Sequence, residues 1–275
     1  MVKAKSKPKT KATSTPTSRP PVVTEPPHLV ADLTSLRLAT MASEWERQAA
    51  ESSRQGHSLP EYLATLAHLE VTARRERRIN RRIKEAKFPV VKTLDAFDFD
   101  AVPSVDRDQV LELFRCEWVE AKSNLVFLGP VGVGKTHLAT ALGVACCQRD
   151  YRVRFTTAAE LVNDLVEAKQ DGRLTRKLNQ LGRFDVLTID EVGYLPFDRE
   201  SADLLFTLIG RLYEQRSLVL TTNLPFSRWS EVFHDATAAA AVIDRVVHHS
   251  TILKVEAESY RLREAKEGGR SRQRK

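Results

Sequence analysis

Residues 124–136 read NLVFLGPVGVGKT. The apolar run 125–128 predicts a buried parallel strand, and the residues after it match the pattern G-x-x-x-x-G-K-[ST] at every fixed position. Glycines let the backbone turn tightly and bring its N–H groups close to anionic oxygens. A helix that begins near Lys135 directs its positive end toward the same anion. This stretch is predicted to be a phosphate-binding loop, and the alternative is a chance glycine-rich turn.

Such a loop gives individual residues a chemical role. The lysine of the pattern reaches the β- and γ-phosphates of ATP, and the hydroxyl that follows holds Mg²⁺. ATP and Mg²⁺ are therefore the predicted cofactors, with Lys135 on the phosphates and Thr136 on the metal. The residues predicted to contact the nucleotide here are Gly129, Pro130, Val131, Gly132, Val133, Gly134, Lys135, Thr136 and His137.

Charge is unevenly distributed over the 275 residues, whose formal net charge is +7. Residues 1–27 hold six basic and one acidic residue, residues 74–87 hold eight and two, and residues 261–275 hold seven and two. The rest of the chain is acidic. Basic segments on an acidic body indicate a polyanionic partner such as nucleic acid, and the alternative is solvated charge that keeps the protein soluble.

Neither a disulfide framework nor a zinc site is expected. The three cysteines, Cys116, Cys146 and Cys147, lack C-x-x-C spacing. The pair His248–His249 has no third ligand at metal spacing in the sequence. No apolar run approaches the roughly 18 residues of a membrane helix, so a cytoplasmic protein without a membrane partner is expected.

The N-terminal third divides by composition. Residues 1–30 are predicted to be a disordered basic tail. Residues 31–88 are predicted to form a helical domain that binds DNA or a partner, with one helix from Asp32 to about Gly56 and another over 59–87. The second helix carries basic residues that either contact DNA or lie on a solvated face. They are Arg74, Arg75, Arg78, Arg81 and Arg82.

A linker is expected over 89–105, with Leu94, Phe97 and Phe99 as apolar anchors, and a helix over about 106–121. Strands then alternate with helices, which predicts an α/β fold with a parallel sheet covered on both faces. The expected strands are 125–128, 152–156, 185–189, 217–222 and 251–255. Ligands in such folds bind at the carboxyl ends of the strands, where the chemical candidates are expected to lie.

Polar residues follow two of these strands. Asp190 is predicted to hold Mg²⁺, and Glu191 to deprotonate the water that attacks the γ-phosphate. The alternative is a helix cap followed by a first-turn acid. Asn223 is predicted to position that water, or else it caps the next turn.

Two arginines near the C-terminus are further candidates. Arg245 is predicted to reach the γ-phosphate of a neighbouring subunit, and the alternative is an intramolecular pair with Asp244 or another acid. Arg261 is predicted to contact the nucleotide within its own chain, or else it belongs to the charged tail.

With these motifs assembled, the chain resembles the IstB-type transposition helper ATPases, which belong to the AAA+ group together with the DnaC-type helicase loaders. The resemblance covers roughly residues 30–262. It rests on GPVGVGKT, on LTIDEVGYLPFD at 187–198, on TTN at 221–223, and on the DRVVHHS and ESYR stretches. It implies an AAA+ ATPase domain over 106–262 without a well-developed C-terminal lid, followed by a basic tail over 263–275.

The resemblance also implies roles. Lys135 and Thr136 correspond to Walker A, Asp190 and Glu191 to Walker B, and Asn223 to sensor 1. Arg245 stands where the arginine finger is expected, and Arg261 where a sensor 2 arginine is expected. In this group the helical stretch between the second and third strands lines the DNA-facing interior. Its basic residues are therefore DNA candidates: Lys169, Arg173, Arg176 and Lys177.

The function implied is an ATPase, Mg²⁺-dependent, that oligomerises on double-stranded DNA and recruits or stimulates the cognate transposase of an insertion sequence. The nearest alternative is a helicase loader that binds a replicative helicase through its N-terminal helices. A P-loop kinase lacks support because no substrate lid is evident. A nucleotide-locked scaffold without turnover stays open.

Overall fold

The computed structural model describes residues 26, 28–194, 196–233 and 235–257. The described residues up to Arg77 form one compact unit and those from Arg78 form another, so the division falls inside helix α3 (Leu59–Ala86). The predicted functional domains, with their boundary near residue 88, stay a prediction. The predicted C-terminal tail and the question of a lid concern residues 258–275, outside the described residues.

The first unit contains α1 (Leu29–Ser35), α2 (Ala39–Gln55) and the beginning of α3. The prediction of one continuous helix from Asp32 to Gly56 is wrong. Arg37 has a φ of 59°, in the left-handed region, and this reverses the chain between α1 and α2.

A buried carboxylate holds the first unit together. Glu70 of α3 is 3% exposed, and its side chain accepts hydrogen bonds from the backbone N–H groups of Thr40 (2.7 Å) and Met41 (3.0 Å). These N–H groups belong to the first turn of α2, where no intrahelical acceptor exists. Arg74 donates to the same carboxylate at 2.7 Å. Glu70 thus caps a helix that begins 31 residues earlier in the chain.

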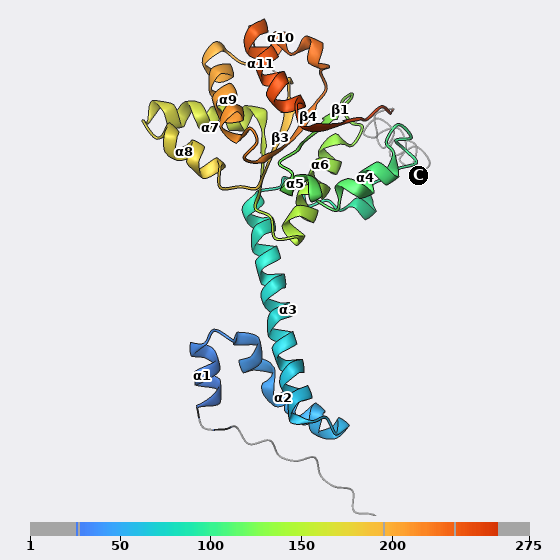
Figure 1. Ribbon diagram of the computed structural model, residues 1–275, viewed down its shortest axis with the longest axis vertical. Helices are drawn as coiled ribbons and strands as arrows, with labels where there is room; N and C mark the ends of the chain where they lie inside the picture. Colours follow the sequence, from blue (N-terminus) through green and yellow to red (C-terminus); the bar gives the residue numbers. More distant parts are fainter. Residues whose placement is uncertain (1–25, 27, 195, 234, 258–275) are drawn as a thin grey trace, which may run out of the picture. The chain divides into compact units, whose positions relative to one another are not determined.

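The second unit is built on a five-stranded parallel sheet, as the sequence predicts (Figure 1). The spatial order of the strands is β2-β3-β4-β1-β5. This order places the end of β4 between the ends of β1 and β3. The strands are β1 (Asn124–Leu128), β2 (Val153–Thr157), β3 (Val186–Val192), β4 (Ser217–Thr222) and β5 (Ser250–Lys254).

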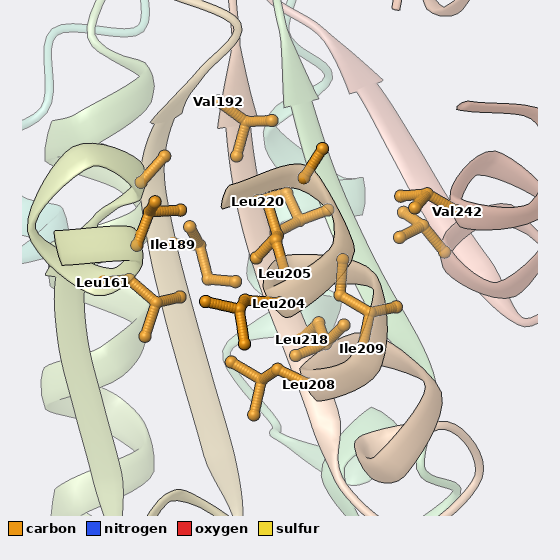
Figure 2. Close-up of a cluster of buried hydrophobic side chains, with 14 of the residues drawn as sticks. Leu161, Ile189, Val192, Leu204, Leu205, Leu208, Ile209, Leu218, Leu220 and Val242 are labelled. Carbon is orange, nitrogen blue, oxygen red and sulfur yellow. The ribbon is translucent and has the colours of Figure 1, made fainter. Parts of the chain in front are cut away.

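Apolar clusters cover both faces of the sheet. On one face, Leu204, Leu205, Leu208 and Ile209 of one helix pack against β3 and β4 (Figure 2). The helices of this face are α7 (Ala158–Gln170), α8 (Leu174–Leu181), α9 (Arg199–Leu212), α10 (Ser230–Phe233) and α11 (Ala236–Val247). The other face packs against α6 (Lys135–Gln148), α4 (Arg107–Leu113) and α5 (Glu117–Glu120). Two short 3₁₀ helices, η1 (Leu94–Ala96) and η2 (Phe226–Arg228), complete the elements of the described residues.

The prediction of one continuous helix over about 106–121 is wrong. Cys116 has a φ of 61°, so α4 and α5 are separate short helices. Among the described residues, no helix has the length and apolar content needed to cross a membrane.

Candidate nucleotide-binding site

The glycine-rich loop connects β1 to α6, as predicted. Gly132 and Gly134 have φ values of 84° and 98°, a backbone region that favours glycine. At Gly134 a Cβ would also lie 2.8 Å from the Phe97 ring, and at Gly129 it would lie 1.9 Å from the carbonyl oxygen of Val255. Close backbone and ring contacts therefore require glycine at both ends of the loop.

Lys135 points back over the loop. Its ammonium group donates to the carbonyl oxygens of Gly129 (2.7 Å) and Pro130 (2.6 Å), and the residue is 9% exposed. The charge is thus held above the loop at the start of α6, where the helix N-terminus adds to the positive potential. An anion bound in the loop would meet both.

The residues predicted to hold Mg²⁺ lie side by side. The Thr136 hydroxyl donates to Asp190 Oδ1 at 3.1 Å, and Asp190 is 4% exposed. The Thr221 hydroxyl at the end of β4 donates to the same oxygen. A hydroxyl next to a carboxylate is the hard oxygen donor set that Mg²⁺ prefers. The residues present fit Mg²⁺, with Thr136 and Asp190 as the groups that would hold it.

Glu191 occupies an irregular place in β3. Its φ is 62°, and the pairing of β3 with β4 shifts register between Ile189 and Val192. The Glu191 N–H donates to Thr221 Oγ1 at 2.9 Å. Bulges of this kind re-aim side chains next to active sites. Here the bulge separates a buried Asp190 from an exposed Glu191.

A single pocket joins the three strand ends. It is lined by the loop, by the end of β3 and by the end of β4, and so brings Lys135 and Thr136 together with Glu191 and Asn223. Its lining residues are Val131, Gly132, Lys135, Thr136, Glu191, Tyr194, Thr221, Thr222 and Asn223. The chemical roles of these residues stay predictions, but their predicted convergence is what the structure shows.

His137 is placed differently from the other loop residues. Its Nε2 lies 2.9 Å from the Thr93 carbonyl oxygen, and its ring meets the Phe97 ring edge-on with centroids 5.4 Å apart. His137 therefore contacts the linker 89–105. Linker residue Phe97 packs both here and against Gly134, in keeping with its expected role as an apolar anchor.

Arg245 lies away from this pocket, near the amino ends of the strands. Asn124, the first residue of β1, donates its side-chain amide to the carbonyl oxygens of Arg245 (3.4 Å) and Val246 (3.0 Å). The expectation that every chemical candidate lies at the carboxyl ends of the strands is therefore wrong for Arg245.

The Arg245 guanidinium lies 4.6 Å from the centroid of the Phe206 ring and donates to the Ala241 carbonyl oxygen at 3.0 Å. The alternative, a pair with Asp244, is not among the ion pairs of the described residues. Arg261 lies outside the described residues.

Most DNA candidates are paired with acids. Between β2 and β3, Lys169 pairs with Glu200 (2.7 Å), Lys177 with Asp164 (2.5 Å) and Arg173 with Asp171. Arg176 is exposed and forms no ion pair with the described residues. Among the candidates in α3, Arg74 pairs with Glu70, Arg81 with Glu85, and both Arg78 and Arg82 with Asp150. The remaining candidate of α3, Arg75, is exposed.

Three features of this unit were not anticipated from the sequence. Tyr194 is 62% exposed and lines the pocket three residues after Glu191. Thr221 joins Asp190 to Glu191, although its residue type alone gives no such signal. The pair His248–His249 has a candidate third ligand in space, because Glu214, just after α9, has a carboxylate oxygen within 4.8 Å of a nitrogen of each ring. The chain brings these residues together only by folding.

Residues 31–268 match the model of the family described as IstB-like ATP binding protein. The chain belongs to this family. A Geobacillus stearothermophilus protein, described as an ATP-binding protein of insertion sequence IS5376, is 43% identical over 229 residues, which cover 83% of this chain and 91% of that protein. The corresponding protein of insertion sequence IS21 from Pseudomonas aeruginosa is 42% identical over 237 residues, covering 86% and 89%.

Solved structures agree with the fold of this IstB-like protein. AMPPCP-bound DnaA from Aquifex aeolicus aligns with a TM-score of 0.51 and 22% identity, over 67% of this chain and 56% of that chain. DnaI aligns with a TM-score of 0.50 and 18% identity, over 61% and 89%. At such identities the likeness concerns the fold alone, which is α/β of the AAA+ type with a helical N-terminal region.

Proposed function

We propose that this IstB-like protein is a Mg²⁺-dependent ATPase that converts ATP and water to ADP and phosphate. One observation carries the proposal: a single pocket unites Lys135 and Thr136 with Glu191 and Asn223, and Asp190 lies directly behind it. A phosphate loop, a metal-binding oxygen pair, a carboxylate base and an amide are the parts that phosphoanhydride hydrolysis requires.

The chemistry follows from these positions. Glu191 accepts a proton from a water molecule while the water oxygen attacks the γ-phosphorus, and the bond from that phosphorus to the β–γ bridging oxygen breaks. The Asn223 amide orients the water, and the Lys135 ammonium offsets the charge on the phosphoryl oxygens. Thr136 and Asp190 would hold Mg²⁺, whose charge would further stabilise the phosphoryl oxygens.

Arg245 is proposed to serve a neighbouring copy of the chain. It lies at the amino end of β1, whereas the pocket lies at the carboxyl end of the same strand. Five strand residues span about 16 Å, which is too far for an arginine to complete the pocket of its own chain. The Phe206 ring and the Ala241 carbonyl hold the guanidinium in place. ATP would thus join two subunits, one contributing the loop and the next contributing Arg245.

The biological role is proposed from the relatives. They are described as ATP-binding proteins of insertion sequences, so we place this chain beside a cognate transposase that it recruits or stimulates. Assembly on double-stranded DNA is supported by the basic segments at residues 1–27, 74–87 and 261–275. Hydrolysis would then limit the lifetime of the assembly on DNA.

A mixing experiment tests the shared site. Lys135→Ala and Arg245→Ala are each expected to lack ATPase activity when pure, for different reasons. Mixed, the Arg245→Ala chain supplies an intact loop and the Lys135→Ala chain supplies Arg245, so activity should partly return. No recovery, in a mixture that still assembles, would contradict a site shared between subunits.

DNA binding tests the biological part. Affinity for random-sequence duplex DNA is measured with ATP, with ADP and without nucleotide, across a series of salt concentrations. Cooperative binding that requires ATP and falls steeply with salt is expected, because many phosphates are contacted. Binding that ignores the nucleotide would contradict assembly on DNA and favour a helicase-loader role.

A further inference from the structure

Three metal-ligating side chains meet on the surface of the second unit, outside the nucleotide pocket. Glu214, His248 and His249 each offer one ligand atom, and these atoms all lie within 4.8 Å of one another. The Glu214 Oε1 to His249 Nε2 distance is 3.8 Å. Two ligands of a tetrahedral Zn²⁺ ion lie about 3.4 Å apart, given metal–ligand distances near 2.1 Å. Small side-chain rotations would therefore bring these atoms to coordination distance.

The backbone under each ligand is fixed by hydrogen bonds. Glu214 has a φ of 57° in the tight turn that ends α9, where the next two N–H groups both donate to the Leu212 carbonyl oxygen at 2.9 Å. The His248 N–H donates to the Asp244 carbonyl oxygen at 3.0 Å, at the end of α11. The His249 carbonyl oxygen accepts from the Asn124 N–H of β1 at 2.7 Å. Two hydrogen-bonded turns, one after α9 and one between α11 and β5, thus present the three ligands, which lowers the entropy lost on binding.

One imidazole already has the partner that metal-bound histidines need. The Tyr213 hydroxyl lies 2.8 Å from His248 Nδ1. If Nδ1 carries the proton and donates it to the Tyr213 oxygen, the Nε2 lone pair is left for a metal. Ligating histidines are usually held in this way through their second nitrogen, which fixes both tautomer and ring orientation. The ring of His249 meets the ring of His248 edge-on, with centroids 4.1 Å apart.

We propose that Glu214, His248 and His249 form a binding site for a divalent transition-metal ion of the Zn²⁺ class. Two imidazoles with one carboxylate match the preference of Zn²⁺ and not that of Mg²⁺, which selects oxygen ligands. All three side chains are exposed, so they need not be uncovered before the ion binds. Three protein ligands leave the fourth position to water. The site is independent of the ATPase proposal, because it shares no residue with the nucleotide pocket.

Metal binding is tested on the untagged full chain, since a polyhistidine tag would itself bind the probe. Titration with Zn²⁺, followed by calorimetry, is expected to give one site per chain. Titration with Co²⁺ is expected to give the visible absorption bands of a four-coordinate ion. His249→Gln should abolish both signals, and Glu214→Gln should weaken the affinity at least about tenfold.

Two further variants separate a built site from general histidine affinity. Tyr213→Phe removes the hydroxyl next to His248 and should weaken Zn²⁺ binding about tenfold, while ATP binding stays unchanged. His68→Gln removes an exposed histidine of α3 and should leave the titration unchanged. Absence of a stoichiometric site, or equal losses for His249→Gln and His68→Gln, would overturn the proposal. Far-UV circular dichroism confirms that each variant is folded.

Discussion

The hydroxyl of Thr221 donates a hydrogen bond to the carboxylate of Asp190 across the strands β4 and β3. The hydroxyl oxygen of Thr221 also accepts a hydrogen bond from the Glu191 N–H at 2.9 Å. One buried threonine therefore links the proposed metal ligand to the proposed base. Thr221 is 1% exposed. It holds the irregular end of β3 in the shape that separates the two acids.

Thr221→Val should therefore lower ATPase turnover about 10- to 100-fold, because Asp190 and the Glu191 N–H each lose a partner. Thr221→Ser keeps the hydroxyl and should restore most of the rate. The matched control is Thr188→Val in β3, where a fully buried hydroxyl has no hydrogen-bond partner among the residues that the structure describes. Steady-state kinetics decide the outcome: equal effects of the valine variants on kcat would show that the hydroxyl of Thr221 has no special role.

Glu191→Gln should retain ATP binding and lose about 10²- to 10⁴-fold in hydrolysis, since an amide cannot accept the proton of the attacking water. Lys135→Ala should instead lose nucleotide binding, because the ammonium no longer faces the phosphates. Binding is measured by fluorescence of a labelled ATP analogue, and hydrolysis by phosphate release. A Glu191→Gln enzyme that turns over at the unaltered rate would remove Glu191 as the base.

Acid should destabilise the first unit through Glu70. Burial raises the pKa of this carboxyl, but hydrogen bonds from the Met41 N–H, from Arg74 and from the Thr40 N–H lower it by more. The net pKa therefore lies below the ordinary value of 4.5. A group whose pKa is lowered by folding contributes stability that is complete above its unfolded pKa. That contribution is lost as the pH falls from about 4.5 through the lower folded value.

Glu70→Gln should accordingly cost about 1–3 kcal/mol at pH 7, and the difference from the unaltered protein should shrink below pH 4.5. Hydrogen exchange of the amides in the first turn of α2 reports on this unit. Glu61→Gln, at an exposed carboxylate at the start of α3, is the control and should change the exchange of α2 little. A difference that persists unchanged at low pH would contradict the ionised cap.

Arg176 is the strongest of the DNA candidates between β2 and β3, because its neighbours are neutralised by acids. Arg176→Glu should weaken DNA binding. It should also reduce the slope of log affinity against log salt concentration by about one, the value of a single phosphate contact. Arg115→Glu, at an exposed arginine beyond α4, is the control. Fluorescence anisotropy over a salt series distinguishes them, and equal losses for the two reversals would remove Arg176 from the interface.

The pocket could be foreseen because its parts follow strands. A loop pattern after residues 125–128 and two acids after residues 186–189 must meet when parallel strands align their carboxyl ends. Glu214 could not be assigned to His248 in the same way, since they are 34 residues apart and the elements β4, η2, α10 and α11 lie between them. The same holds for Glu70, whose partners Thr40 and Met41 lie in another helix. Arg37 and Cys116 ended helices in left-handed conformations that their residue types do not announce.

Arg245 and the nucleotide pocket lie at opposite ends of the strands. An assembly in which Arg245 contacts the pocket of the next copy would therefore be polar. If Arg245 of one copy completes the pocket of the next, the contact is head-to-tail and uses two different surfaces of each copy. An open chain of subunits would then have two unlike ends, with one terminal copy holding ATP that no arginine reaches. Hydrolysis would be slowest at that terminus, so growth and loss of subunits would favour different ends.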